Sequence, residues 1–582
     1  MKRVYPFLYL MLFSTITHAQ KTVIKWGEEF KLRRGSTDLR VIAADDDGAY
    51  LEESHVAMKA YFVVGASFRE SASLVKVDKN LTEVYRNDFN KELRGKEFVQ
   101  FFACQEKLFL FSSDYSKRDR TLALYASAVN KKTGELTGEW REVATFQKGE
   151  KRDDIDFRIG YNADSTTMLI VSSVEGSEKN EYKIQELDKN LKATARPLIL
   201  RNEFERKKYQ LEDVLYTNDR KIVLVGRMFE YEEGRKKKEK FLDFTNYNIR
   251  IYNNKGKQEA EINTGINGKW LSSTKLVQEK NKDLVLAAFY SNEKKGRTID
   301  GLLVQRINVA DGKVISTSDR KINNSLLSGD QDKEDDDDTD DTDDKDESRD
   351  ERKMRAELGK MKDEGEGFSR HMQFRKIFYT ADDGLVILAE QYRHYVTTSQ
   401  SYTPGSHGSP SQWRSSTYAH YLSGDLMMCK IDASGNIGWL QILPKDQREI
   451  IMMNSSTAPT SGLYYHNSYF NEGNRPFYSG FGALQAGGSI QLLMNDHSKN
   501  SNVTQAGQKA KAIGRYAKSN CYLVSVNEAS GKVTRKVFFS NTEVPTAMPR
   551  LGAIVGNDMY MVGKTDRMMG KSKIAIGKIT SR

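Results

Sequence analysis

The segment Asp425-Leu426-Met427-Met428-Cys429-Lys430-Ile431 runs directly into Asp432-Ala433-Ser434-Gly435, after which a second strand-like run begins. Asp and Asn cap tight turns with their side chains, and Gly and Asn tolerate positive φ, so this segment predicts a β-hairpin. The same pattern occurs seven times along the chain, starting at Asp78, Asn130, Asp188, Asn253, Asn308, Asp432 and Asn527.

The hairpin turns recur at an interval that defines a repeat. Successive starting positions lie 52, 58, 65, 55, 124 and 95 residues apart, so the unit has about 50 to 65 residues and the last two intervals contain insertions. Two apolar runs precede each turn, for example residues 374–379 and 384–389 before the turn at Asp432. The unit therefore has four antiparallel strands, A to D, with the recurring turn between C and D. Such a repeat is typical of an all-β fold, the β-propeller.

The two ends of the chain predict the number of blades. Three strand-like runs, residues 551–555, 559–562 and 574–577, follow the seventh turn, and residues 23–26 form an unpaired strand at the other end. Pairing the N-terminal strand with the three C-terminal strands leaves no open sheet edge. We therefore expect eight blades, with seven blades as the first alternative and two smaller β-domains as the second.

Because of this repeat, residues 21–582 resemble bacterial exported β-propeller repeat proteins. The resemblance implies the fold and assigns no functional residue. The turn Ser434-Gly435-Asn436-Ile437-Gly438-Trp439 also resembles a quinoprotein dehydrogenase blade, but it occurs once, so it supports the blade and implies no cofactor.

The first 19 residues have the pattern of a secretory signal peptide. Lys2 and Arg3 precede an apolar run over residues 4–16, and small residues flank His18 before a cleavage site after Ala19. The run is shorter than the ~20 residues that span a bilayer, so an uncleaved anchor is the less favoured alternative. We expect residues 20–582 to form a single propeller domain outside the cytoplasm, whether periplasmic, secreted or surface-associated, without a transmembrane segment. In that setting Cys104, Cys429 and Cys521 are expected to be buried free thiols, because two of them lie in apolar runs.

The net charge of +10 is an average over unlike parts. Residues 330–350 contain 14 acidic and 3 basic side chains, whereas the remaining mature chain has 85 basic and 66 acidic ones. A run of like charge repels itself, so residues 323–371 are expected to be an acidic, disordered insertion with a short helix at residues 347–361. The run lacks the spacing of a calcium-binding loop, and we assign it no metal.

The insertions are predicted to share one face of the propeller. Residues 230–240, 391–424 and 495–520 fall between strands B and C, and residues 323–371 fall between D and the next A. Both connections leave a four-stranded meander at the same end, opposite the short C–D turns. Loops on a rigid scaffold are where binding concentrates, so this looped face is the predicted functional face. The alternative is that a large scaffold merely tolerates long loops.

Residues 391–424 are rich in aromatic side chains among Ser, Thr, Gly and Pro. Flat rings beside hydroxyl and amide groups suit sugar rings or peptide segments. The alternative is that several of these rings pack the loop onto the scaffold. The candidate binding residues are Tyr392, Tyr395, Trp413, Tyr418, His420 and Tyr421.

Motifs of known chemistry are missing from the sequence. It has no G-x-S-x-G, H-E-x-x-H, C-x-x-C or P-loop motif, so no catalytic residue, metal or cofactor is assigned. Nucleic acid is not expected as a partner, because the positive charge lacks a clustered motif and the compartment is wrong. The preferred function is a noncatalytic binding or scaffolding propeller for a glycan, an envelope component or a protein. The alternative is a polysaccharide hydrolase or lyase.

Deletion of residues 330–350 tests whether the acidic run covers a basic surface. The deletion removes a net charge of −11, so affinity for anionic ligands is expected to rise at low ionic strength. Affinity is to be measured by titration with a polyanion at two salt concentrations. An unchanged affinity at low salt would contradict the idea of an electrostatic cover.

Overall fold

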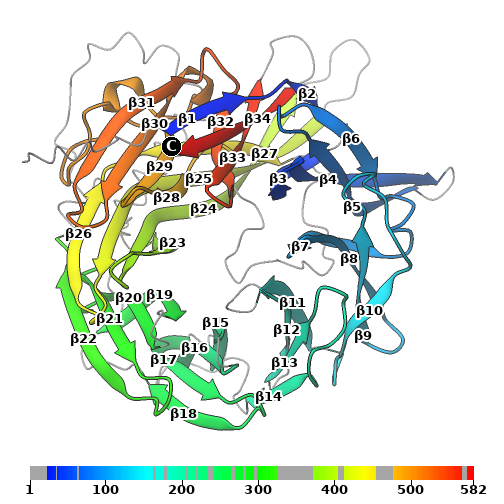
Figure 1. Ribbon diagram of the computed structural model, residues 1–582, viewed down its shortest axis with the longest axis horizontal. Coiled ribbons are helices and arrows are strands. Elements are labelled where there is room, and N and C mark those ends of the chain that lie inside the picture. Colours follow the sequence, from blue (N-terminus) through cyan, green and yellow to red (C-terminus); the bar gives the residue numbers. More distant parts are fainter. Residues whose placement is uncertain are drawn as a thin grey trace, which may run out of the picture.

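The strands form eight sheets arranged as a ring in the computed structural model (Figure 1). The structure describes residues 22–33, 36–61, 65–151, 153–161, 166–175, 180–202, 208–217, 220–231, 242–263, 269–278, 283–293, 298–323, 327, 371–403, 412–453, 476–565 and 573–581. Each sheet contains four consecutive strands in meander order, apart from the sheet that includes the N-terminus. The first strand of a blade lies toward the inside of the ring and the fourth toward the outside (Figure 1).

The strands of blades 1 to 4 follow one another along the chain. Blade 1 contains β3 (Ser36–Asp45), β4 (Gly48–Tyr61), β5 (Gly65–Val77) and β6 (Glu83–Asp88). Blade 2 contains β7 (Glu97–Cys104), β8 (Lys107–Ser116), β9 (Thr121–Val129) and β10 (Arg141–Gln147). Blade 3 contains β11 (Asp154–Tyr161), β12 (Met168–Glu175), β13 (Asn180–Leu187) and β14 (Leu198–Asn202). Blade 4 contains β15 (Tyr209–Tyr216), β16 (Ile222–Tyr231), β17 (Leu242–Tyr252) and β18 (Gln258–Asn263).

Blades 5 to 7 continue the order, and blade 8 joins the two ends. Blade 5 contains β19 (Trp270–Gln278), β20 (Leu284–Ser291), β21 (Gly301–Ile307) and β22 (Val314–Lys321). Blade 6 contains β23 (Met372–Tyr379), β24 (Leu385–Thr403), β25 (Gln412–Ile431) and β26 (Ile437–Leu443), with β27 (Gln447–Met453) added on β25. Blade 7 contains β28 (Gly482–Ala486), β29 (Ser489–Asp496), β30 (Asn520–Asn527) and β31 (Val533–Ser540). Blade 8 contains β32 (Thr546–Val555), β33 (Asp558–Thr565), β34 (Lys573–Ser581) and β1 (Thr22–Trp26), with β2 (Phe30–Lys31) also on β34.

The N-terminal strand completes the last blade, as the sequence predicts. β1 pairs antiparallel with β34, from Thr22 opposite Ser581 to Trp26 opposite Gly577. The predicted eight-bladed all-β propeller is therefore confirmed, and the alternatives of seven blades and of two smaller β-domains are wrong. Pairing the two ends of the chain closes the ring without an open edge in this blade.

The core is divided among the blade interfaces. Eight clusters of buried apolar side chains are present, and each combines strands of two neighbouring blades. One cluster joins blades 8 and 1, with Val562 and Ile576 packed beside Leu51 and Val75. The interface that closes the ring is thus built like the others.

All seven recurring turns connect strands C and D, as predicted. Their Asp or Asn side chains cap the turn; Asp432 Oδ1, for example, accepts hydrogen bonds from the amides of Ser434 (2.8 Å) and Asn436 (2.9 Å). Positive φ falls on glycine in five turns, but in the other two it falls on Leu81 and Leu191 and not on a glycine or asparagine. Burial of each leucine against an inter-blade cluster offsets the ~1–2 kcal/mol cost of a left-handed conformation.

The turns also dock on the preceding blade. The turn of blade 7 packs on Trp439 of β26, whose indole Nε1 donates a hydrogen bond of 3.0 Å to the Glu528 carbonyl oxygen. The turn of blade 6 accepts a hydrogen bond of 3.2 Å from Ser316 Oγ of β22 at the Ser434 carbonyl. Short C–D turns are therefore part of the inter-blade contact.

The predicted insertions lie at B–C and D–A connections, but one of them is not a loop. Residues 391–424 mostly extend β24 and β25, which pair from Tyr392 opposite Ser423 to Thr403 opposite Gln412. Ser, Thr and Tyr tolerate an extended, half-exposed strand, which explains how a polar composition forms a hairpin. Blade 1 carries a second long B–C hairpin, β4–β5, which the sequence analysis missed. Residues 495–520 do form a largely irregular B–C loop, containing η4 (Ser498–Asn500) and η5 (Tyr516–Lys518).

Several predictions lie outside the described residues. These are the signal peptide at residues 1–19, the acidic run at residues 330–350 and the short helix at residues 347–361. Within the described ranges, no helix is long and apolar enough to cross a membrane. Cys104, Cys429 and Cys521 are buried free thiols, as predicted. Burial raises the pKa of all three, that of Cys429 to about 12, so these thiols are not activated nucleophiles.

Replacing Gly531 with alanine tests the docking of a C–D turn. Gly531 has φ +69°, and an added Cβ would lie 2.7 Å from Trp439 Cδ2. Gly488, with φ +68° and no atom within 4 Å of its added Cβ, is the matched control for backbone strain. We expect Gly531→Ala to lose about 1–3 kcal/mol more than Gly488→Ala, because only the former overpacks an interface. The measurement is urea denaturation, and equal losses would refute a role of the turn in blade contact.

Candidate functional site

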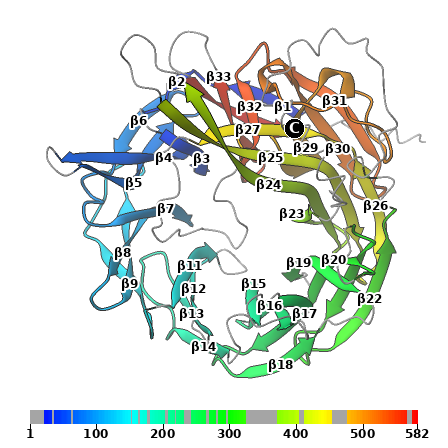
Figure 2. The same ribbon diagram turned by 180° about the vertical axis from the view of Figure 1, so that it is seen from behind.

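The candidate site is built on the long hairpin of blade 6. We define the blade-6 hairpin as residues 392–403 of β24 and residues 412–423 of β25, together with β27, which pairs along β25 from Gln447 opposite Ser423 to Met453 opposite Thr417. In Figures 1 and 2, β24 and β25 run well beyond β23 toward β2. The hairpin leaves blade 6 at its B–C end, on the predicted looped face.

Cross-strand ring pairs stabilise the blade-6 hairpin. His394 stacks on Tyr421 with ring centroids 4.8 Å apart, and Tyr395 stacks on His420 at 4.7 Å. His420 Nε2 also lies 2.7 Å from Thr397 Oγ1. Such pairs contribute roughly 0.5–1.5 kcal/mol each beyond burial, so they favour an ordered hairpin.

The six candidate binding residues divide by exposure. Tyr421 and His420 are only 2% and 5% exposed, and they act in packing the hairpin. Tyr392, Tyr395 and Tyr418 are half-buried and keep part of their surface accessible. Trp413 lies in β25, but its side chain is outside the described part of the structure. All six thus lie on one hairpin, but strand alternation puts Tyr392 and Tyr421 on one face and Tyr395, Tyr418 and His420 on the other.

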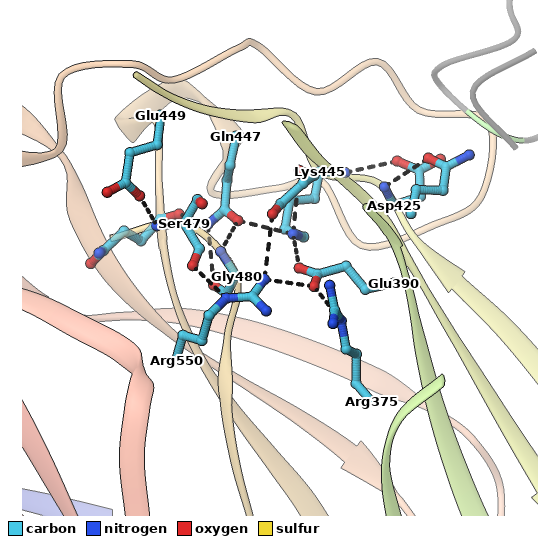
Figure 3. Close-up of polar contacts among 12 residues, drawn as sticks. Arg375, Glu390, Asp425, Lys445, Gln447, Glu449, Ser479, Gly480 and Arg550 are labelled. Carbon is cyan, nitrogen blue, oxygen red and sulfur yellow. Dashed lines mark hydrogen bonds and ion pairs between the residues drawn. The ribbon is translucent and has the colours of Figure 1, made fainter. Parts of the chain in front are cut away.

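A buried carboxylate fixes the base of the hairpin (Figure 3). Glu390 is fully buried; its Oε1 accepts a hydrogen bond of 2.7 Å from Lys445 Nζ, and Lys445 is also fully buried. Its Oε2 accepts bonds from Arg375 Nε at 2.9 Å and from Arg550 Nη2 at 2.8 Å. We call Glu390, Lys445, Arg375 and Arg550 the Glu390 cluster. It joins strands β23 and β24 of blade 6 to β32 of blade 8.

Neighbouring polar groups extend the Glu390 cluster toward blade 7. Gln447 Oε1 accepts hydrogen bonds from Lys445 Nζ (2.9 Å) and from the Gly480 amide (2.7 Å). Glu449 accepts three backbone amide bonds of 2.8 Å each, from residues 477–479. Residues 477–480, which lead into blade 7, are therefore held by Gln447 and Glu449 of β27 (Figure 3).

The electrostatics follow from burial and close contact. Burial by itself raises the pKa of Glu390, but Arg550, Lys445 and Arg375 together lower it well below its usual range. Burial lowers the pKa of Lys445 and, together with the charge of Arg550, that of Arg375. Burial raises the pKa of Glu449, against the effect of its three amide donors. The cluster is thus an ionic network in which each charge depends on its partners.

Tyr392 covers the two arginines of the cluster. Its ring centroid lies 4.4 Å from Arg375 Cζ and 5.2 Å from Arg550 Cζ, at distances that favour cation–π attraction. The candidate residue Tyr392 is therefore next to guanidinium groups that sequence reasoning did not single out. Among the described residues, no group of three or more His, Cys, Asp or Glu is placed to hold a metal ion.

One sequence signal could have identified Glu390. It follows the apolar run of residues 385–389 directly, within the B strand β24. The B strands β4 and β29 carry Glu52-Glu53 and Asn495-Asp496 directly or shortly after their own apolar runs, and these are also buried. Charged residues are rarely buried unless paired, so a charge at this repeat position indicates a partner. The identity of the partners cannot be read from the repeat.

Comparison with known proteins gives a fold-level likeness only. No protein-family model and no curated protein matches this chain. Among solved structures, the polysaccharide lyase Uly1 is 8% identical with a TM-score of 0.32 and covers 94% of this chain and 99% of its own. The β-propeller domain of the Trilobed protease from Pyrococcus furiosus is 11% identical with a TM-score of 0.29, covering 76% and 99%.

Prolyl oligopeptidase B from Galerina marginata is 10% identical with a TM-score of 0.28 and covers 61% of this chain, which spans 39% of that protein's length. At such TM-scores the likeness adds nothing to the strand pairing described above.

Replacing Glu390 with glutamine tests the cluster. The change leaves Lys445 and two arginines around a neutral amide, so we expect a loss of about 3–5 kcal/mol in unfolding free energy. Glu181→Gln, at an exposed pair with Arg201, is the matched control and should lose no more than ~1 kcal/mol. Urea denaturation at neutral pH measures both changes.

The pH dependence follows from the lowered pKa of Glu390. The stabilisation from Glu390 is complete above its unfolded pKa of about 4.5 and is lost as pH falls toward the lower folded pKa. Wild-type protein should therefore lose stability below about pH 5, and Glu390→Gln should lose less over the same range. If the unfolding free energy of the two proteins falls identically below about pH 5, Glu390 is not the carboxylate whose protonation destabilises the fold.

Proposed function

We propose that this protein is an exported, noncatalytic binding propeller that holds a glycan on its looped face, at the blade-6 hairpin. The observation that carries this proposal is the pairing of an aromatic hairpin with a buried ionic anchor at its base. An ordered hairpin presents its rings at little entropic cost on binding, because they are already fixed in the free protein.

The side chains of the hairpin favour a sugar ring as the ligand. Tyr392, Tyr395 and Tyr418 are half-buried, so each offers part of a flat ring beside a polar group. Thr398, on the same strand as Tyr392, is exposed and supplies a hydroxyl group. Ring faces beside hydroxyl groups complement the alternating apolar and polar surface of a saccharide. They complement a purely apolar surface of a protein partner less well.

The signal-peptide pattern at residues 1–19 supports a glycan or another envelope component as partner. A ligand in that compartment is met without crossing a membrane. Two alternatives compete with this proposal: a protein partner, and a polysaccharide hydrolase or lyase activity. The screen described next distinguishes both from glycan binding without turnover.

The test is a screen of purified protein against soluble polysaccharides. Binding is measured by affinity electrophoresis and calorimetry, and turnover by release of reducing ends and of unsaturated products. Binding without product supports the proposal. Product release would replace it with a polysaccharide-degrading activity, and the absence of binding to every glycan would favour a protein partner.

A point substitution locates the binding surface. Tyr392→Ala is expected to weaken glycan binding about tenfold, which corresponds to the loss of one aromatic contact. Tyr161→Ala is the matched control, because Tyr161 is 44% exposed at the A–B end of blade 3, on the opposite face. Equal weakening by the two changes would refute a site on the blade-6 hairpin.

A further inference from the structure

Arg375 and Arg550 reach the Glu390 cluster from two different blades. Arg375 lies at an irregularity of β23, where pairing with β24 shifts between Phe374 and Lys376. Arg550 lies where the pairing of β32 with β33 is interrupted. Such irregularities re-aim side chains, and here they direct two guanidinium groups to the same oxygen, Glu390 Oε2.

The arginines have more donors than the protein uses. A guanidinium group carries five N–H donors, and Arg375 makes its only hydrogen bond to a described residue through Nε. Its Nη2 is buried without an acceptor in the described part of the structure. Arg550 donates through Nε to the Ser479 carbonyl (3.0 Å) and through Nη2, but its Nη1 has no acceptor among the described residues. A buried donor without an acceptor, here Arg375 Nη2, is uncommon and calls for a partner such as water or a ligand oxygen.

The position of the two guanidinium groups is fixed from several sides. Arg550 packs on Gly480, where an added Cβ would lie 2.2 Å from its Nη2, so no side chain fits there. Tyr392 covers both groups with its ring. The side chains remain 20% exposed at Arg375 and 16% at Arg550, so solvent reaches part of each. The pair is thus held in place yet accessible.

We propose that Arg375 and Arg550, beneath the ring of Tyr392, bind a carboxylate group of an acidic polysaccharide. A planar carboxylate matches the guanidinium fork, and an oxyanion beside the pair would offset the repulsion between two cations that share one oxygen of Glu390. The sugar ring that bears the carboxylate would lie against Tyr392. This inference rests on the proposed glycan-binding function and adds the chemical class of the ligand.

The test compares two probes that differ only in the carboxylate. Oligogalacturonate and the same oligosaccharide after carboxyl reduction are titrated by calorimetry into full-length protein in 0.2–0.3 M salt. We expect wild-type protein to prefer the acidic probe at least tenfold, because carboxyl reduction removes the charge-assisted hydrogen bonds to the two guanidinium groups. Arg375→Gln should remove this preference, so that the ratio of the affinities for the two probes approaches one.

Arg201→Gln is the matched control for net charge. Arg201 is 70% exposed in blade 3 and its replacement removes the same unit charge, so it should leave the preference intact. Equal losses in Arg201→Gln and Arg375→Gln would identify nonspecific attraction of a polyanion and overturn the inference. If Arg375→Gln does not fold, Arg375→Lys keeps the charge but not the fork, and it should weaken binding of the acidic probe at least fivefold.

The two proposals fail in different ways. Wild-type protein that binds both probes equally overturns the carboxylate site and keeps glycan binding. Wild-type protein that binds neither these probes nor any other glycan overturns the proposed function and the carboxylate site together.

Discussion

Each blade of this protein buries its two faces only against other blades, so the fold depends on a ring that closes. The core is divided among eight inter-blade clusters, and one of them joins the first blade to the last. Hydrogen bonds between strands from the two ends of the chain close the ring, because β1 pairs with residues 577–581 of β34 and β2 pairs with Lys573 and Ile574. A break at this seam would expose apolar surface on two blades at once and leave an open sheet edge.

The two faces of the closed ring, one with the C–D turns and one with the B–C and D–A connections, have different roles. At one end the C–D turns are short and dock on neighbouring blades, so they cannot vary without disturbing the core contacts. The other end is free to carry the blade-6 hairpin, the β4–β5 hairpin and the loop between β29 and β30. The Glu390 cluster spans blades 6 and 8 at this end. Buried charges cost free energy unless they are paired, so the cluster selects one position for the hairpin.

Local sequence patterns predict the turns correctly, but they mispredict residues 391–424 as a loop. Asp432 and its six equivalents encode a turn within a few residues, and the repeat of that turn predicts the strands around it. Residues 391–424 are polar and contain Gly and Pro, which is typical of a loop, yet pairing with β27 and stacking of His394 on Tyr421 make most of them strand. His420 and Tyr421 are likewise buried within the hairpin, where they stack on Tyr395 and His394 of the paired strand.

The sequence by itself determined the four-stranded unit, the count of eight blades and the end of the ring that bears the insertions, because these follow from turn chemistry and strand order within short segments. Only the tertiary structure decided that Arg375, Glu390 and Arg550 meet. Glu390 and Arg550 are 160 residues apart, and their contact depends on the curvature of the ring and on two irregular strands. No local sequence pattern encodes this contact, because the positions of blades 6 and 8 in space result from many small rotations between successive blades.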